Sequence, residues 1–281
     1  MRRALVLTVG STLLAAAACS LAVDTGGLAG GSSAGGTSTS SSTGGLSGAS
    51  SSGASSSGAS SSSGSVDAGP LDCTGALLCD DFESSTPNPV WTYHANGGSL
   101  LQIDGVKPRG GARSLHAARL DISAPNAAYI QAQVDVTYLA CEVDAWAENL
   151  DAKEVAEVLT LQWGGVPGYG NVEPAYVFLT GEGILLGNIA TLPDGGTPVD
   201  AQTSASIPGG GKERWVHLSL RVTSSGARLT YTPAGAAAGT LQLPVNLLPT
   251  APRTNVYVGM VYTVNPAKPV TFVDNVRCTA P

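Results

Sequence analysis

Three acidic residues alternate along one stretch of the sequence in a pattern that could carry acid–base chemistry. The stretch 138–148 reads YLACEVDAWAE, so Glu142, Asp144 and Glu148 fall on one side of an extended chain. Glu142 and Asp144 would lie about 7 Å apart and could form a pair in a glycoside hydrolase or lyase. Glu142 and Glu148 would be roughly 20 Å apart, whereas a retaining glycosidase needs carboxyl groups about 5 to 5.5 Å apart. The alternative is an exposed acidic strand face, so we assign no catalytic residue.

Aromatic residues close to these acids favour sugar binding. Trp146 shares the strand face of Glu142 and Asp144, and Trp163 and Tyr169 lie at and after the end of a second predicted strand. An aromatic ring can stack on the apolar side of a pyranose while carboxylates and amides bind its hydroxyl groups. These five residues are the predicted ligand contacts, with packing beneath loops as the alternative role of each tryptophan.

Four cysteines in the C-terminal part of the chain predict disulfide bonds. Cys73, Cys79, Cys141 and Cys278 form an even set with three possible connectivities, which the sequence does not distinguish. Cys73 and Cys79 are close enough for a local loop, which would leave Cys141 with Cys278. Neither pair has the C-x-x-C spacing of a zinc site, and the histidines are scattered. The G-x-S-x-G, H-E-x-x-H and phosphate-loop motifs are also absent from residues 69–281.

Apolar and polar residues alternate with a period of two beyond residue 69, as in half-buried strands. Val256 to Val264 is apolar on both faces, which predicts a central strand covered on each side. The other predicted strands are 77–83, 99–104, 114–120, 128–136, 138–148, 155–163, 175–180, 183–190, 214–223, 227–232, 240–243 and 270–277.

These strands are short, and glycine- and proline-containing turns separate them. The pattern predicts an all-β fold in which two antiparallel sheets pack as a jelly-roll sandwich. No predicted strand precedes a helix of useful length, and no glycine fingerprint opens one, which excludes a dinucleotide-binding Rossmann fold.

The first residues predict export. Met1 to Arg3 carry positive charge, and the apolar run after them is too short to span a bilayer. Residues 13–19, LLAAAAC, resemble a bacterial lipobox, which implies a signal peptide over 1–18 and a lipid on Cys19. Ser20 after that cysteine favours the outer membrane or cell surface. An ordinary cleavage site, which would leave a secreted soluble protein, is the alternative.

Residues 19–68 predict a flexible tether ahead of one domain at 69–281. From 25 to 65 every residue is Gly, Ser, Ala or Thr except Leu28 and Leu46, and such a segment cannot bury enough apolar surface to fold. The chain has a net charge of −7, and removing Arg2 and Arg3 leaves 12 − 21 = −9. This acidic balance argues against nucleic acid and anionic membrane surfaces as partners, so contact with a membrane would run through the lipid alone.

Short motifs at both ends of the domain resemble the concanavalin A-like (LamG-like) jelly rolls of secreted bacterial proteins. They are CDDFE at 79–83, Trp91, the segment 97–104, RGG at 109–111 with SLH at 114–116, and FVDNV at 272–276. The resemblance implies a lectin-like domain that binds carbohydrate or glycoconjugate. Its laminarinase-type members carry Glu-x-Asp-x-Glu, and here Trp146 replaces the second Glu. A structural or protein-interaction domain with no sugar ligand is the third alternative.

The same resemblance implies a structural calcium ion. Alternation places Asp274 on the face of Val270, Phe272 and Val276, which should be buried, and a buried carboxylate needs a partner. In related jelly rolls an Asp at this place helps to bind calcium. We therefore expect calcium on Asp274, with Glu83 as a second ligand. The alternative is that Asp274 accepts hydrogen bonds from backbone amides or pairs with Arg277.

Overall fold

The computed structural model describes residues 71–86, 88–120, 127–151, 154–164, 171–191, 199–208, 210–245, 252–263 and 268–281. The signal peptide, Cys19, the tether and Tyr169 lie outside these residues. Within the described ranges every regular element is a β-strand, and none of them holds a helix long and apolar enough to cross a membrane.

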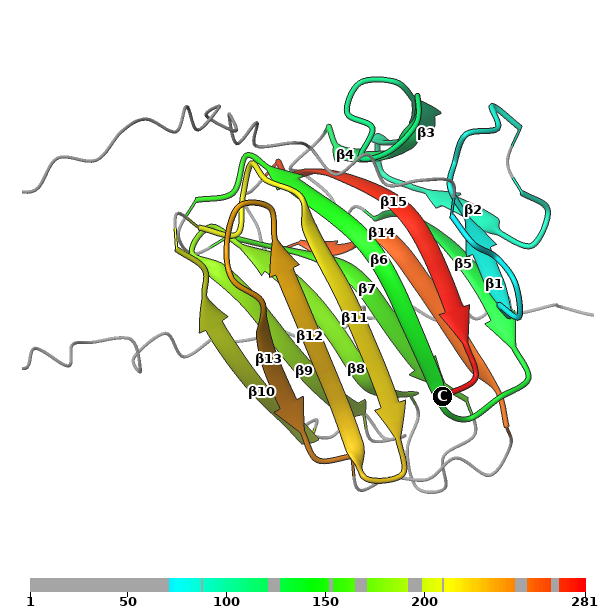
Figure 1. The fold of residues 1–281 in the computed structure, drawn as a ribbon, viewed down its shortest axis with the longest axis vertical. Helices are drawn as coiled ribbons and strands as arrows, with labels where there is room; N and C mark the ends of the chain where they lie inside the picture. Colours follow the sequence, from blue (N-terminus) through cyan, green and yellow to red (C-terminus); the bar gives the residue numbers. More distant parts are fainter. Residues whose placement is uncertain are drawn as a thin grey trace, which may run out of the picture. The chain divides into compact units, whose positions relative to one another are not determined.

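The strands form two antiparallel sheets that lie one in front of the other (Figure 1). The β6 sheet has the order β13 (Gly239–Leu243), β12 (Gly226–Pro233), β11 (Val216–Thr223), β6 (Leu139–Glu148), β15 (Val270–Thr279), β4 (Ser114–Arg119) and β3 (Ser99–Asp104), and β1 (Leu78–Asp80) also pairs with β15. The β7 sheet has the order β10 (Val199–Ser206), β9 (Gly183–Thr191), β8 (Asn171–Thr180), β7 (Val155–Trp163), β14 (Thr254–Thr263), β5 (Ala128–Val134) and β2 (Thr92–Ala95). The predicted two-sheet jelly-roll sandwich is confirmed.

One hydrophobic core fills the space between the sheets. The predicted inner face of β6 is buried and belongs to this core. Alternate residues of β5, β11 and β12 are buried in the same core. Period-two alternation was sufficient to find these strands because each has one apolar face and one polar face. Among the strands of the described residues, β2 and β10 were not predicted. Both are edge strands, and the inward residues of β10 include the small Ala201 and Ala205, so its apolar signal is weak.

β14 is a central strand between β7 and β5, as predicted, but the prediction that it is covered on both faces is wrong. Val256 and Val258 lie in the core, but Tyr257 on the opposite face is only half-buried and Tyr262 is 41% exposed. A tyrosine ring is apolar enough to resemble a core residue in the sequence, yet its hydroxyl allows it to stand at a surface.

Two disulfides link Cys73 with Cys79 and Cys141 with Cys278. Cys141 and Cys278 are direct register partners on β6 and β15, with Cα atoms 4.1 Å apart. The local loop that the sequence allowed is therefore formed, and the second bond joins two central strands of the β6 sheet.

Candidate functional site

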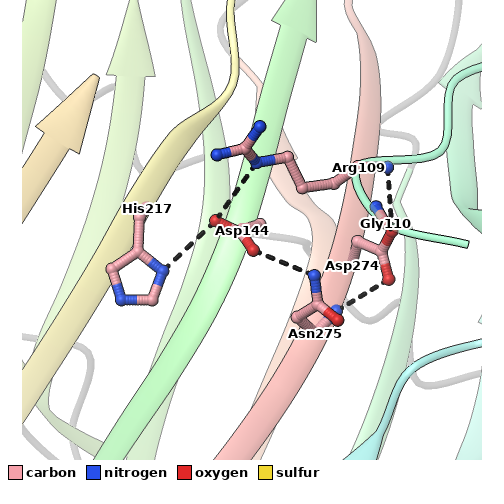
Figure 2. A network of polar contacts seen from close by, with 6 residues as sticks. All are labelled: Arg109, Gly110, Asp144, His217, Asp274 and Asn275. Carbon is pink, nitrogen blue, oxygen red and sulfur yellow. Dashed lines mark hydrogen bonds and ion pairs between the residues drawn. The ribbon is translucent and has the colours of Figure 1, made fainter. Parts of the chain in front are cut away.

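Asp144 lies on the outer face of the β6 sheet and is held by residues from three other segments (Figure 2). His217 Nδ1 on β11 is 3.2 Å from one carboxylate oxygen, and the Arg109 Nε is 3.9 Å from the same oxygen. The Asn275 side-chain amide on β15 donates to the other oxygen at 3.0 Å. Asp144 is only 6% exposed, whereas Glu142 is exposed. The two acids predicted as a pair thus have different environments, and both carboxylate oxygens of Asp144 already contact other side chains.

The hydrogen bond with Asp144 raises the pKa of His217. A protonated His217 therefore adds to the positive groups around the Asp144 carboxylate, together with Arg109. This arrangement neutralises a buried acid, which is a structural role.

Asp274 is fully buried, as predicted, and shares a face with Phe272. That face is the outer one of the β6 sheet, where Asp144 lies, whereas Val276 is on the core face, contrary to the prediction. Asp274 and Asp144 are register partners, but a β-bulge shifts the pairing of β15 with β6 between Asp274 and Arg277. Asn275 takes up the extra residue with a φ of 53°. Because one inserted residue reverses the alternation, Phe272 and Asp274 point outward while Val276 and Cys278 enter the core.

The contacts of Asp274 and Glu83 do not fit the expected calcium ion. Asp274 accepts hydrogen bonds from the backbone N–H of Arg109 at 2.9 Å, of Gly110 at 3.2 Å and of Asn275 at 2.8 Å. The Glu83 carboxylate accepts the backbone N–H groups of Ala112 and Arg113. N–H groups present positive charge to the oxygens that a cation would need. Moreover, among the described residues no three His, Cys, Asp or Glu side chains are grouped to hold a metal ion.

Burial of Asp274 raises its pKa to about 7, and the neighbouring Asp144 charge acts in the same direction. The backbone hydrogen bonds act in the opposite direction. These contacts agree with the alternative prediction, in which Asp274 accepts hydrogen bonds from backbone amides. Arg277 does not pair with it and instead donates to the Thr74 carbonyl.

Trp146 is half-buried, and Lys107 of the loop between β3 and β4, residues 105–113, lies over its ring. The Lys107 ammonium lies 3.9 Å from the centre of the Trp146 ring, and Trp215 approaches edge-on with ring centroids 5.9 Å apart. The Trp146 indole N–H donates to Glu148, which also pairs with Lys107. These contacts favour the packing alternative for Trp146, because a stacking sugar would have to displace the lysine.

Trp163 is a core residue of the other sheet. It is 1% exposed, and its indole N–H donates to the Thr137 carbonyl at 2.8 Å. The prediction that Trp163 contacts a ligand is wrong, because its ring is enclosed between the sheets. The structure therefore does not bring Trp163 together with Trp146, Asp144 and Glu142.

The outer face of the β7 sheet carries a group of aromatic and amide side chains, which we call the tyrosine–amide face. It consists of His94 on β2, Tyr129 and Gln131 on β5, Gln162 on β7 and Tyr257 on β14. Ring centroids are 5.0 Å apart between His94 and Tyr129 and 5.4 Å apart between Tyr129 and Tyr257. The Tyr257 hydroxyl donates to the Gln162 side chain at 2.7 Å. All five residues are half-buried, so they combine fixed positions with access from solvent.

Strand pairing explains why these side chains meet. Gln131 and Tyr257 are direct partners between β5 and β14, and His94 faces Tyr129 between β2 and β5. Gly259 stands opposite Tyr129, and an added Cβ would come within 2.8 Å of the Ala128 carbonyl oxygen, so glycine allows the two backbones to approach closely here. Burial raises the pKa of Tyr257 to about 12, so its hydroxyl remains protonated and can donate at neutral pH.

Two glutamates adjoin the tyrosine–amide face. Glu157 on β7 is 6% exposed, and burial, assisted by the charge of Glu173, raises its pKa to about 8. The Thr160 hydroxyl donates to Glu157. Burial also raises the pKa of Glu173 on β8, and a hydrogen bond with Gln162 opposes that shift. At neutral pH the pair therefore holds a proton.

Burial raises the pKa of Tyr176 on β8, and the charges of Asp200 and Glu157 act in the same direction. Its ring lies against Gly187, where an added Cβ would come within 2.1 Å of ring atoms. Its hydroxyl donates to Asp200 at 3.1 Å and accepts from Gln202 at 3.0 Å. A side chain larger than glycine at 187 would displace the ring.

The sequence contained a signal for this face that our interpretation did not use. Alternation over 128–136 placed Ile130 and Ala132 inward, and so Tyr129 and Gln131 outward. Glu157 was harder to find, because the pairing of β7 with β8 shifts between Glu157 and Leu159 and interrupts the period of two. The meeting of β2, β5, β14, β7 and β8 depends on the order of strands in the sheet.

No family model matches the chain, and no curated protein sequence matches it. Among solved structures, the endo-β-1,4-glucuronan lyase of the fungus Trichoderma reesei is similar with a TM-score of 0.53 and 7% identity, covering 73% of this chain and 96% of that chain. A cellulose-induced protein has a TM-score of 0.47 and 12% identity, over 73% of this chain and 97% of that one. A family 16 endo-glucanase of Bacteroides ovatus has a TM-score of 0.46 and 12% identity, over 72% and 99%. At these identities the likeness concerns the fold, which is consistent with the concanavalin A-like jelly roll expected from the sequence.

Proposed function

We propose that this protein is an exported, lipid-anchored jelly roll that binds carbohydrate or glycoconjugate across the tyrosine–amide face. The observation that carries the proposal is the contact series His94, Tyr129 and Tyr257 beside the amides of Gln131 and Gln162. This position replaces the one that we expected around Trp146, where the β3–β4 loop covers the ring.

The chemistry of the face suits a sugar ring. Aromatic planes bind the C–H side of a pyranose, and the amides can donate to and accept from its hydroxyl groups. Glu173 adds a carboxylate that can accept from a hydroxyl. Neighbouring strands fix these groups, so little conformational entropy is lost when a ligand binds.

A panel of polysaccharides in affinity electrophoresis tests the proposal. Tyr129→Ala and Gln131→Ala should each weaken retention by about tenfold, because each removes one contact worth roughly 1 to 1.5 kcal/mol. Trp146→Ala is the matched control on the other sheet and should keep its retention, provided that melting curves show every variant folded. Loss in Trp146→Ala with retention in Tyr129→Ala would instead restore the originally predicted site.

A second candidate, a polysaccharide-cleaving enzyme, is favoured by the glutamate pair. A carboxylic acid that holds its proton at neutral pH is what general acid catalysis requires, and burial gives Glu157 that property. Glu157 is only 6% exposed, so a substrate would have little access to it, and we keep binding as the leading function. Release of reducing ends or unsaturated sugars from the same panel, abolished in Glu157→Gln and retained in Glu182→Gln, would establish the enzyme.

A further inference from the structure

A groove of about 540 Å³ lies on the β6 sheet at the end formed by β11, β12 and β13. It is separate from the tyrosine–amide face, which belongs to the β7 sheet. Its lining includes two arginines, two hydroxyl residues of the β11–β12 turn and one amide: Arg221, Arg228, Thr223, Ser225 and Gln242.

The two arginines face each other across β11 and β12. Arg221 on β11 and Arg228 on β12 are direct register partners, and both are exposed. Within the described part of the chain neither forms an ion pair or a side-chain hydrogen bond. Glu142 lies two residues from Ala140, the β6 partner of Arg221, and it forms no ion pair with that arginine. Like charges directly opposite each other across two strands destabilise a sheet.

The charge balance of the chain makes this pair unusual. The sequence has 21 acidic residues against 14 Lys and Arg, so carboxylates are in excess. A bound anion would remove the repulsion between the two guanidinium groups, and each guanidinium can bind a carboxylate or sulfate through two parallel hydrogen bonds.

The surrounding groups suit a small anion on a polar carrier. Gln242 on β13 is the direct partner of Arg228, which places an amide next to the guanidinium. The Thr223 and Ser225 hydroxyls are 2.8 Å apart at the turn, and Thr223 also donates to the Gly226 carbonyl, so rotation of the Ser225 hydroxyl is what would supply a donor to a ligand. The net negative charge of the chain opposes approach to an extended anionic surface, but it does not prevent binding of a single anionic group.

We infer that the Arg221–Arg228 groove is a second ligand site, which binds the carboxylate or sulfate group of an acidic saccharide. The choice of a saccharide as carrier rests on the proposed function. The anion site itself does not, because it uses other residues on the other sheet.

Isothermal titration at low ionic strength tests the site with three probes: a glucuronate oligosaccharide, a sulfated chondroitin disaccharide and inorganic sulfate. At least one saccharide should bind, and Arg221→Gln and Arg228→Gln should each weaken it by tenfold or more. The double variant should abolish binding while its ligand-free melting temperature stays equal or rises, because the like-charge pair is gone. Arg253→Gln, an exposed arginine of the β7 sheet side, is the matched control and should bind normally.

Three results would overturn the inference. They are no binding of any probe, equal loss in Arg253→Gln, and inorganic sulfate binding as tightly as both saccharides, which would show an ion site with no saccharide specificity. Tyr129→Ala separates the two proposals. This variant should lose retention on neutral polysaccharide but should still bind the acidic saccharide in the titration. The two proposals can therefore fail independently of each other.

Discussion

Asp274 and Glu157 are both buried carboxyl groups, and the chain stabilises them in different ways. Asp274 accepts three backbone N–H groups. Glu157 has one hydroxyl donor, Thr160, and lies near the like charge of Glu173. Because one neutral donor cannot offset the cost of burying a charge, burial raises the pKa of Glu157 to about 8. Burial also raises the pKa of Asp274, but its three backbone donors oppose that shift and the value is about 7.

This difference predicts a specific pH dependence for Glu157. Its pKa is about 8 in the folded protein and 4.5 ordinarily. Between those values the folded state binds a proton that the unfolded state has released, so the free energy of unfolding contributed by this group falls as pH rises. Glu157→Gln cannot ionise. Relative to the wild type, it should gain on the order of 2 to 4 kcal/mol at pH 8 and little at pH 4.5.

Urea unfolding at pH 4.5 and 8 measures the effect. Glu182→Gln, an exposed glutamate in the β8–β9 turn, is the control and should show the wild-type dependence. Parallel pH profiles for wild type and Glu157→Gln would contradict the raised pKa.

The bulge in β15 determines what the β6 sheet presents on each face. Before the bulge, Phe272 and Asp274 point outward, and after it Val276 and Cys278 point into the core. Asn275 tolerates the left-handed backbone, and its side chain binds Asp144. The outward Asp274 then holds the loop between β3 and β4, whose Lys107 covers Trp146.

Asp274→Ala should therefore destabilise the protein by about 3 kcal/mol or more, because three backbone donors lose their acceptor. Asp135→Ala, in the exposed turn after β5, should change stability little. Chelation with EDTA should leave the wild-type melting temperature unchanged, since amide donors occupy the Asp274 oxygens. A fall with EDTA that disappears in Asp274→Ala would restore the calcium expectation.

The two outer faces of the sandwich have different properties. The loop 105–113 closes part of the β6 sheet, while the β7 sheet presents half-buried aromatic and amide groups. The Cys141–Cys278 bond joins central strands far apart in the chain and so constrains the unfolded state strongly. Such bonds persist in oxidising compartments, which agrees with the export that we propose.

The proposed anchor makes a prediction for the full chain. Cys19→Ser removes the atom that would carry the lipid, so the variant should move from the membrane fraction to the soluble fraction when the gene is expressed in a Gram-negative host. Labelling with a fatty-acid analogue should mark the wild type only. Ser20→Ala is the control and should remain labelled, and unchanged membrane retention of Cys19→Ser would argue against the anchor.

The strands and their inner faces could be predicted from the sequence, because the spacing of apolar residues such as Leu139, Val143, Leu218 and Ile130 indicates which face of each strand is buried. The candidate site could not be obtained in this way. His94, Tyr129, Tyr257 and Gln162 come from four strands, and their proximity depends on which strand pairs with which. The burial of Asp274 was predicted correctly, but its grouping with Val276 was wrong, because a bulge is a backbone event that leaves little trace in the residue types.

Local alternation of side chains was enough to establish the all-β class, the two-sheet packing and most strand ranges, because burial on one face is a property of each strand alone. The disulfide pairing, the occupied state of Asp144, the shared proton of Glu157 and Glu173, and the Arg221–Arg228 pair all depend on neighbours distant in the chain. Those neighbours are set by strand order and register, and it is they that determine the dielectric surroundings and hydrogen bonds of each group.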